Sequence, residues 1–436
     1  MNRILAIELR RSAALGAALV IAAAGTLVLH ATAGRWSGGW MALVMTQREY
    51  LAVLSPLAMA AGAWQSYREH RANVAELFAG TPRPRPQRIV PILVTTGLTV
   101  LAAYLLTLLA AAPRIADTAR YLPPAAGAVV AVGLIAMIAS VWLGLAVGRL
   151  IPALATAPAL AVTGFVLLVL APHTLPDGGV TAAFSPAMGM SMFSDYDTVD
   201  GEVSLAQALW TAAVAAAGVV LLAVRHRRSA FAALVPLALG ATATLLVVPT
   251  GDAYARGTLD PAAQELVCTH DAPRVCVSRA HEGLLPEVTP KARHALELLS
   301  NTSLVTAHED TTTFSPPTAP RPRADTALMR ITVDRHGRLA HPGRLEPAML
   351  TAVFTGPPGC ADTWNFQVAT AAAYWLLDRE PATGPEGLES DDPEAAKLWR
   401  QLKTLPPAEA GARVRAVYQA ARTCQDTTDL LTRSAR

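Results

Sequence analysis

Charged side chains are scarce in the first part of this sequence, and their scarcity excludes a wholly soluble protein. Only 16% of the 436 residues are charged, against about 25% in ordinary soluble domains. Five segments contain no Asp, Glu, Lys or Arg, namely 89–112, 125–148, 150–172, 205–224 and 230–250. Because an α-helix needs about 20 residues to cross the hydrocarbon core of a bilayer, these segments predict a membrane domain.

Several catalytic motifs are also missing. No Gly-x-x-x-x-Gly-Lys-Ser/Thr run occurs, so a nucleotide-binding P-loop is not expected in this chain. His281-Glu282 lacks the second histidine of a zinc-peptidase helix because Leu285 stands in its place; we expect His281 and His294 at the surface. The sequence therefore predicts no enzyme activity, no cofactor and no metal site. The small net charge of +3 gives no reason to expect a nucleic-acid partner.

Seven membrane-spanning helices are predicted within residues 1–249. Their outer surfaces are expected to contact membrane lipid. The helices cover about residues 13–32, 50–65, 89–111, 125–147, 152–171, 205–224 and 230–249. The second is short, and Arg48 and Glu49 beside it are expected to snorkel towards water. Apart from His30, the spans contain no acidic, basic or histidine side chain. Ion-coupled carriers usually need such groups, so the pattern favours an external energy source or no transport.

The arginines predict the orientation of these spans, since cytoplasmic loops are richer in Lys and Arg. With the N-terminus in the cytoplasm, the cytoplasmic segments hold twelve arginines and the opposite loops only four. Seven spans then place residues 250–436 outside the cytoplasm. A six-span count would place them inside, so the span 230–249 decides the location of this domain.

All four cysteines lie in the C-terminal domain, which is typical of disulfides in an oxidising compartment. Three pairings are possible; we favour Cys268 with Cys276, across the Asp271-Ala272-Pro273 turn, and Cys360 with Cys424. A zinc site is the competing interpretation, but no Cys-x-x-Cys occurs and His270 has no second ligand at a suitable spacing.

The C-terminal domain is predicted to be mainly α-helical, which makes the chain an all-α polytopic membrane protein with a helical outer domain. The expected helices are Asp362–Asp378, with Trp364 and Trp375 in the core, Pro393–Leu405 and Ala408–Leu431. One hairpin is expected from Ala327 to Ala340, turning at Asp334-Arg335-His336-Gly337.

The cytoplasmic stretch Trp64–Arg85 carries the most specific pattern. It is predicted to be helical to about Ala79 and to stop at Gly80, before three prolines. Val74, Leu77 and Phe78 share one apolar edge, and Glu69 and Glu76 add charge elsewhere. A short amphipathic helix of this kind fits into a groove of another protein, or it is simply a solvated loop with a basic anchor.

This loop resembles the one between the second and third spans of bacterial ABC-type exporter permeases, the type 2 permease family. The resemblance lies in Glu76-Leu77 followed by Gly80-Thr81-Pro82-Arg83-Pro84, and in the layout of residues 1–228. It implies a permease dimer in the bacterial plasma membrane, driven by a separate ATP-binding cassette subunit that docks on residues 66–85. The implied coupling residues are Glu69, Val74, Glu76, Leu77 and Phe78.

The chain departs from that family in its seventh span and its large outer domain. These additions leave room for a different function class, a membrane-anchored extracytoplasmic sensor or interaction protein without transport activity.

Overall fold

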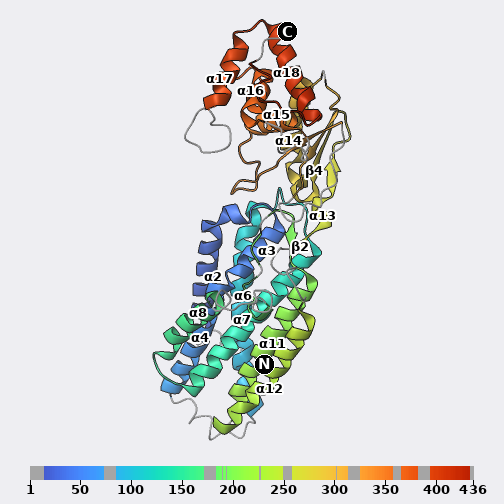
Figure 1. Ribbon diagram of the computed structural model, residues 1–436. Helices are drawn as coiled ribbons and strands as arrows, with labels where there is room; N and C mark the ends of the chain where they lie inside the picture. Colours follow the sequence, from blue (N-terminus) through green and yellow to red (C-terminus); the bar gives the residue numbers. More distant parts are fainter. Residues whose placement is uncertain are drawn as a thin grey trace. The chain divides into compact units, whose positions relative to one another are not determined.

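The computed structural model describes most of the chain. The described residues are 14–72, 85–170, 183–188, 190–192, 194–224, 227–248, 258–300, 302–312, 325–356, 365–381 and 393–432. The chain divides into two compact units, Met1–Pro261 with Arg335–Gly337 and Ala262–Asp334 with Arg338–Arg436 (Figure 1).

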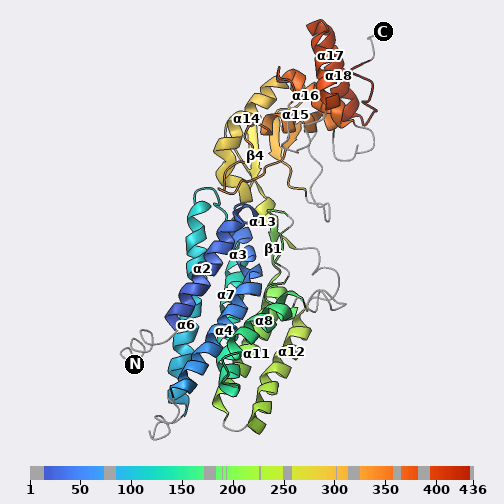
Figure 2. The same ribbon diagram turned by 90° about the vertical axis from the view of Figure 1, so that its left-hand side faces the viewer.

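The first unit is a bundle of helices that run along a common direction (Figures 1 and 2). Its main helices are α2 (Ala14–Ala31), α4 (Leu51–Arg71), α6 (Arg85–Ala111), α7 (Pro124–Leu150), α8 (Thr156–Val169), α11 (Gly201–Ala223) and α12 (Leu234–Val247). Helix α7 packs against both α4 and α11, and α11 packs against α12. The short helix α3 (Trp40–Glu49) and a two-residue antiparallel ladder, β1 (Asp197–Thr198) with β2 (Thr258–Leu259), complete the unit.

Five helices of the described chain are long and apolar enough to cross a bilayer. They are Ala14–Ala31, Ile89–Arg114, Pro124–Leu150, Gly201–Ala223 and Ala230–Val247, and they coincide with five of the seven predicted spans. Large apolar side chains on them face outwards, for example Leu27 at 72% and Leu246 at 82% exposure, as expected for surfaces covered by lipid. These helices indicate a membrane protein.

The predicted spans 50–65 and 152–171 are not among the five. Helix α8 has only 14 residues, because Pro152 ends the preceding helix and α8 starts at Thr156. Helix α4 is long enough at 21 residues, but its last third, from Gln65 to Arg71, is polar. The seven-span count is therefore not confirmed.

Glycines allow α4 and α7 to approach at backbone distance. A Cβ added to Gly144 would lie 2.0 Å from the Met59 carbonyl oxygen, and one added to Gly62 would lie 2.3 Å from the Val141 carbonyl oxygen. Gly148 meets Ala63 in the same way. Small residues at such contacts let apolar helices gain dispersion energy where lipid offers no hydrophobic driving force.

The second unit contains a four-stranded sheet that the prediction of a mainly helical domain missed. The strands are β3 (Leu266–Cys268), β4 (Arg274–Ser278), β5 (Thr306–Glu309) and β6 (Thr326–Met329), in that spatial order. β3 and β4 form an antiparallel hairpin, whereas β4, β5 and β6 are parallel. η5 (Arg279–Leu284) and α14 (Leu285–Leu298) connect β4 to β5, as parallel pairing requires.

The hairpin predicted from Ala327 to Ala340 forms only at its tip. Val333 and Leu339 make one antiparallel bridge, and Gly337 adopts a left-handed conformation (φ 75°) in the turn between them. Residues 327–329 instead belong to β6 and pair with β5. The partner strand lies about twenty positions earlier in the chain, so local sequence could not reveal this pairing.

Four helices complete the second unit: α15 (Leu345–Thr355), α16 (Phe366–Leu376), α17 (Pro393–Lys403) and α18 (Pro407–Arg422). The last three overlap the predicted helices. The core joins strand residues such as Val277 to helix residues such as Met349, Val368 and Val417, and Trp375 packs against it partly buried. Trp364 lies outside the described residues.

The predicted bond between Cys268 and Cys276 is confirmed. The two residues face each other in the β3–β4 ladder. The disulfide therefore links the two strands covalently, in addition to their backbone hydrogen bonds. The predicted pairing of Cys360 with Cys424 stays a prediction, because Cys360 lies outside the described residues.

Candidate functional site

Glu69, one of the predicted coupling residues, lies at the end of the bundle where α4 ends and α6 begins (Figures 1 and 2). Glu69 lies in the last turns of α4, and its carboxylate accepts a hydrogen bond from Gln65 Nε2 at 3.0 Å. Val74, Glu76, Leu77 and Phe78 lie outside the described residues. The coupling surface therefore stays a prediction.

A polar centre lies inside the first unit, among otherwise apolar helices. It consists of Gln47 and Arg48 on α3, Tyr104 and Thr107 on α6, and Gln207 on α11. Arg48 and Gln207 are both completely buried. A buried cation in an apolar bundle is costly unless most of its donors find acceptors.

Arg48 finds acceptors on three separate segments. Its Nε donates to the Pro186 carbonyl at 3.0 Å and its Nη1 to the Val129 carbonyl at 3.1 Å. Its Nη2 donates to the side-chain oxygen of Gln207. The planar guanidinium thus ties α3 to α7, to α11 and to the segment 185–188, a fork-like arrangement that the compact ammonium of lysine cannot reproduce.

Gln207 and Gln47 add hydrogen bonds from the polar centre to two further segments of the chain. Gln207 Nε2 donates to the carbonyls of Ser185 at 3.0 Å and Met188 at 3.2 Å. Gln47 Nε2 donates to the Tyr104 carbonyl at 2.8 Å and to Thr107 Oγ1 at 2.5 Å. The other side-chain atom, Gln47 Oε1, is buried and accepts no hydrogen bond from any described residue. It is an acceptor available to water or to a polar group of a bound molecule.

The polar centre corrects the expectation that Arg48 snorkels to water. The sequence placed Arg48 beside a span, and only the packing of α3 against α7 turns its side chain inwards. The apolar residues Val44 and Met45 indicate in the sequence that this segment packs, but not that Arg48 itself is enclosed. Intramembrane charged groups of this kind are candidates for function as well as for packing.

The second unit corrects the surface prediction for His281. Its ring is 2% exposed, with Nδ1 2.5 Å from Glu309 Oε1 and 3.2 Å from Ser278 Oγ. Glu309 Oε2 also accepts the backbone N–H of Ser278 at 2.6 Å. A Ser-His-acid relay needs the hydroxyl and the acid at opposite ring nitrogens. Here both meet Nδ1, so the cluster fixes β4, η5 and β5 to one another and does not form such a relay. His294 is exposed, as predicted, 3.4 Å from Glu346.

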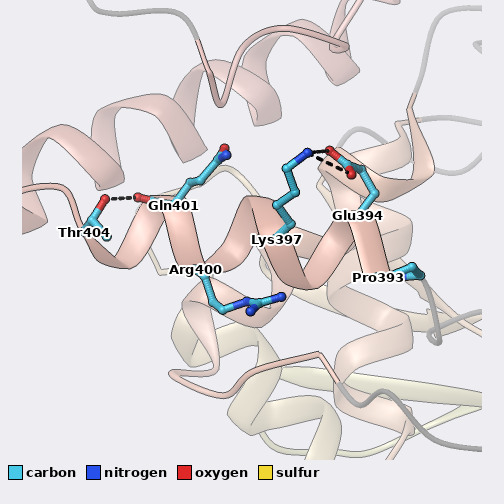
Figure 3. A pocket seen from close by; sticks show the side chains of 6 residues that line it. All are labelled: Pro393, Glu394, Lys397, Arg400, Gln401 and Thr404. Atoms are coloured by element: carbon cyan, nitrogen blue, oxygen red, sulfur yellow. Dashed lines mark hydrogen bonds and ion pairs between the residues drawn. The ribbon is translucent and has the colours of Figure 1, made fainter.

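A hollow on α17 presents charged groups but no converging site. Its described lining residues lie on that one helix or directly after it (Figure 3), and they are Pro393, Glu394, Lys397, Arg400, Gln401 and Thr404. Lys397 forms an ion pair with Glu394 at 3.1 Å. Because no second element contributes to the described lining, we interpret this hollow as a solvated helix face.

Within the described part of the chain, no group of three or more His, Cys, Asp or Glu side chains is placed to hold a metal ion. No family model, curated protein or solved structure matches the chain.

Proposed function

We propose that this protein is the membrane subunit of an ABC-type exporter, driven by a separate ATP-binding subunit that docks on residues 66–85. The observation that carries the proposal is that the two helix ends flanking this segment lie at the same end of the bundle. Helix α4 ends in the polar run Gln65–Arg71 and α6 begins at Arg85 at the same end of the bundle. The sequence between them holds the Glu76-Leu77 and Thr81-Pro82-Arg83-Pro84 elements that resemble those of type 2 permeases.

The packing of the bundle gives the proposal further support. Motion produced by an ATPase at one end of the helices reaches the other end only through stiff contacts. The glycine contacts between α4 and α7 and the Arg48 hydrogen bonds among α3, α7 and α11 are contacts of that kind. Two such subunits, identical or related, complete the exporter in this proposal.

The test is recovery of an ATP-binding partner. The tagged full chain is purified from its native membrane in mild detergent, and P-loop proteins that accompany it are quantified by mass spectrometry. We expect one ATP-binding protein with the wild type. Its recovery should fall about tenfold or more in Glu76→Arg or in the double variant Leu77→Asp, Phe78→Asp, because charge repulsion or a buried carboxylate disrupts docking.

The matched control is Arg120→Glu. Arg120 is exposed and precedes α7 at the opposite end of the bundle from the docking segment, so this charge reversal should leave recovery unchanged. Equal recovery in all variants, or no ATP-binding protein with the wild type, would overturn the exporter proposal.

A second candidate function is a membrane-anchored sensor or interaction protein. The observation that favours it is the second unit, which has its own sheet and hydrophobic core and is larger than a connecting loop needs to be. A gene for an ATP-binding protein next to the gene for this chain favours export; an isolated gene, or one beside a regulator, favours the sensor.

A further inference from the structure

A pocket of about 520 Å³ lies within the second unit, at the carboxyl ends of β5 and β6. Asp310 and Arg330, the first residues after these two strands, both line it. Ligands of parallel sheets bind outside the carboxyl ends of the strands, and small-molecule pockets measure about 300–1,000 Å³. The position and the size of this pocket are both those of a ligand site.

Two helices each present one face to the pocket. On α15 the lining residues are Leu345, Pro347, Ala348, Thr351, Ala352 and Thr355; on α16 they are Phe366, Thr370 and Tyr374. Intervals of three and four residues recur within each set and place it on a single helical face. The small residues of α15 leave the space that the pocket occupies, and the aromatic rings of α16 provide an apolar wall.

Thr370 lines this pocket, and its hydroxyl is buried. Thr370 is 2% exposed, and its Oγ1 makes no hydrogen bond with any described residue. Threonines in helices commonly donate to the carbonyl four residues earlier, as Thr95 does to Pro91 at 2.7 Å. Buried polar atoms are nearly always hydrogen-bonded, and rotation of the Thr370 side chain towards the pocket would give its hydroxyl a ligand as partner.

The charged groups of the pocket favour an anion. Among the described lining residues, Arg330 and Arg344 carry a positive charge, against one carboxylate, that of Asp310, and His341 is a further polar group. That carboxylate is already engaged, since Oδ1 accepts from Thr312 N at 3.0 Å and from Thr312 Oγ1 at 2.6 Å, and Oδ2 lies 3.9 Å from Arg330 Nη2. The N-terminus of α15, with its partial positive charge, begins beside Arg344.

One residue that lines the pocket, His341, also has an unusual backbone conformation. His341 adopts a left-handed conformation (φ 48°), which residues other than glycine rarely take and which is common at ligand sites. The conformation precedes the turn that leads to Arg344 and into α15, where the Arg344 N–H donates to the His341 carbonyl at 2.8 Å.

We propose that this pocket binds a small amphipathic carboxylate. The carboxylate lies towards Arg344 and the N-terminus of α15, the apolar body lies against Phe366 and Tyr374, and the Thr370 hydroxyl hydrogen-bonds to the ligand. Inorganic phosphate shares the negative charge but has no apolar body to fill the space between α15 and α16. This inference does not depend on export, because either a transporter or a sensor uses such a site.

The test uses the full chain in detergent micelles, with empty micelles as the reference for partitioning. Two fluorinated carboxylates, 4-fluorobenzoate and 6-fluorohexanoate, are titrated by ligand-observed ¹⁹F NMR up to about 10 mM, the range in which fragments of this size bind. We expect binding of at least one carboxylate, at least about tenfold tighter than its neutral amide. Inorganic phosphate should compete only weakly.

Three variants locate the site, and a fourth is the control. Arg344→Gln should weaken binding about tenfold, Thr370→Val about fivefold, and Ala352→Leu should abolish it by filling the pocket. Arg400→Gln, on the exposed face of α17 (Figure 3), should bind as the wild type does. Ala352→Leu keeps every polar group of the pocket. It therefore tests whether the ligand binds in this pocket even if Arg344→Gln fails to fold.

The opposite results overturn the proposal. These are no binding of either carboxylate, equal binding of the acid and its amide, equal binding of phosphate, or unchanged binding in Ala352→Leu.

Discussion

Arg48 combines a permanent charge with complete burial in an apolar bundle. Its guanidinium bonds to two backbone carbonyls and to Gln207, so the residue fixes four segments at once. Removing it leaves the Gln207 side chain and both carbonyls short of a donor, which is costly for buried polar groups. At the residue scale this side chain therefore helps to set the shape of the bundle.

We expect Arg48→Gln to lower the stability of the first unit by about 1–3 kcal/mol. Arg48→Lys should not restore it, because an ammonium on a flexible stem cannot serve three separated acceptors. The measurement is thermal unfolding in detergent, followed by tryptophan fluorescence. Arg35→Gln is the control, since Arg35 is half exposed and its pair with Glu49 at 2.7 Å is a surface contact worth about 0–1 kcal/mol. A lysine variant as stable as the wild type would contradict this account.

At the element scale, one face of α7 packs against the backbone of α4, and another face has room for an added methyl group. Gly144 lies against the Met59 carbonyl, whereas nothing lies within 4 Å of a Cβ added to Gly127 on the same helix. Two substitutions of the same chemistry therefore test packing separately from helix propensity.

We expect Gly144→Ala to destabilise the bundle by about 1–3 kcal/mol, the usual effect of overpacking, because α4 and α7 must move apart. Gly127→Ala should be neutral or stabilising by up to about 1 kcal/mol, since alanine favours the helix. Both are measured as shifts of the unfolding temperature in the same detergent. Equal effects of the two substitutions would show that the α4–α7 contact is looser than described.

At the scale of the whole molecule, the orientation of the spans decides where the second unit operates. Five or seven spans that start in the cytoplasm both place residues 250–436 outside it, and only an even count places them inside. The Cys268–Cys276 disulfide agrees with an oxidising compartment, in which such bonds persist.

We therefore expect a reporter that is active only outside the cytoplasm to be active when fused after Ala255 and silent when fused after Arg228. The two positions flank the apolar helix Ala230–Val247, so their difference isolates one crossing. The reverse pattern would mean that the number of spans is wrong by an odd number and that the second unit faces the cytoplasm.

Local sequence determined the features that depend on composition over one segment. Uncharged runs of about 20 residues located the five long apolar helices, because the length needed to cross hydrocarbon is a property of the segment alone. The Cys268–Cys276 bond was predictable because its two residues are separated by a short turn. The stripe of Val368, Ala371 and Ala372 located α16 for the same local reason.

Tertiary structure alone decided which polar groups are buried and which strands pair. Arg48 and His281 were expected near water and are enclosed, because helices and strands from distant parts of the chain close over them. The pocket at the ends of β5 and β6 also has no signal in any one segment, since β6, the residues that follow the two strands, and two helices each contribute to it. Burial and strand pairing are set by long-range contacts, and a pattern read along one segment contains no information about its distant partners.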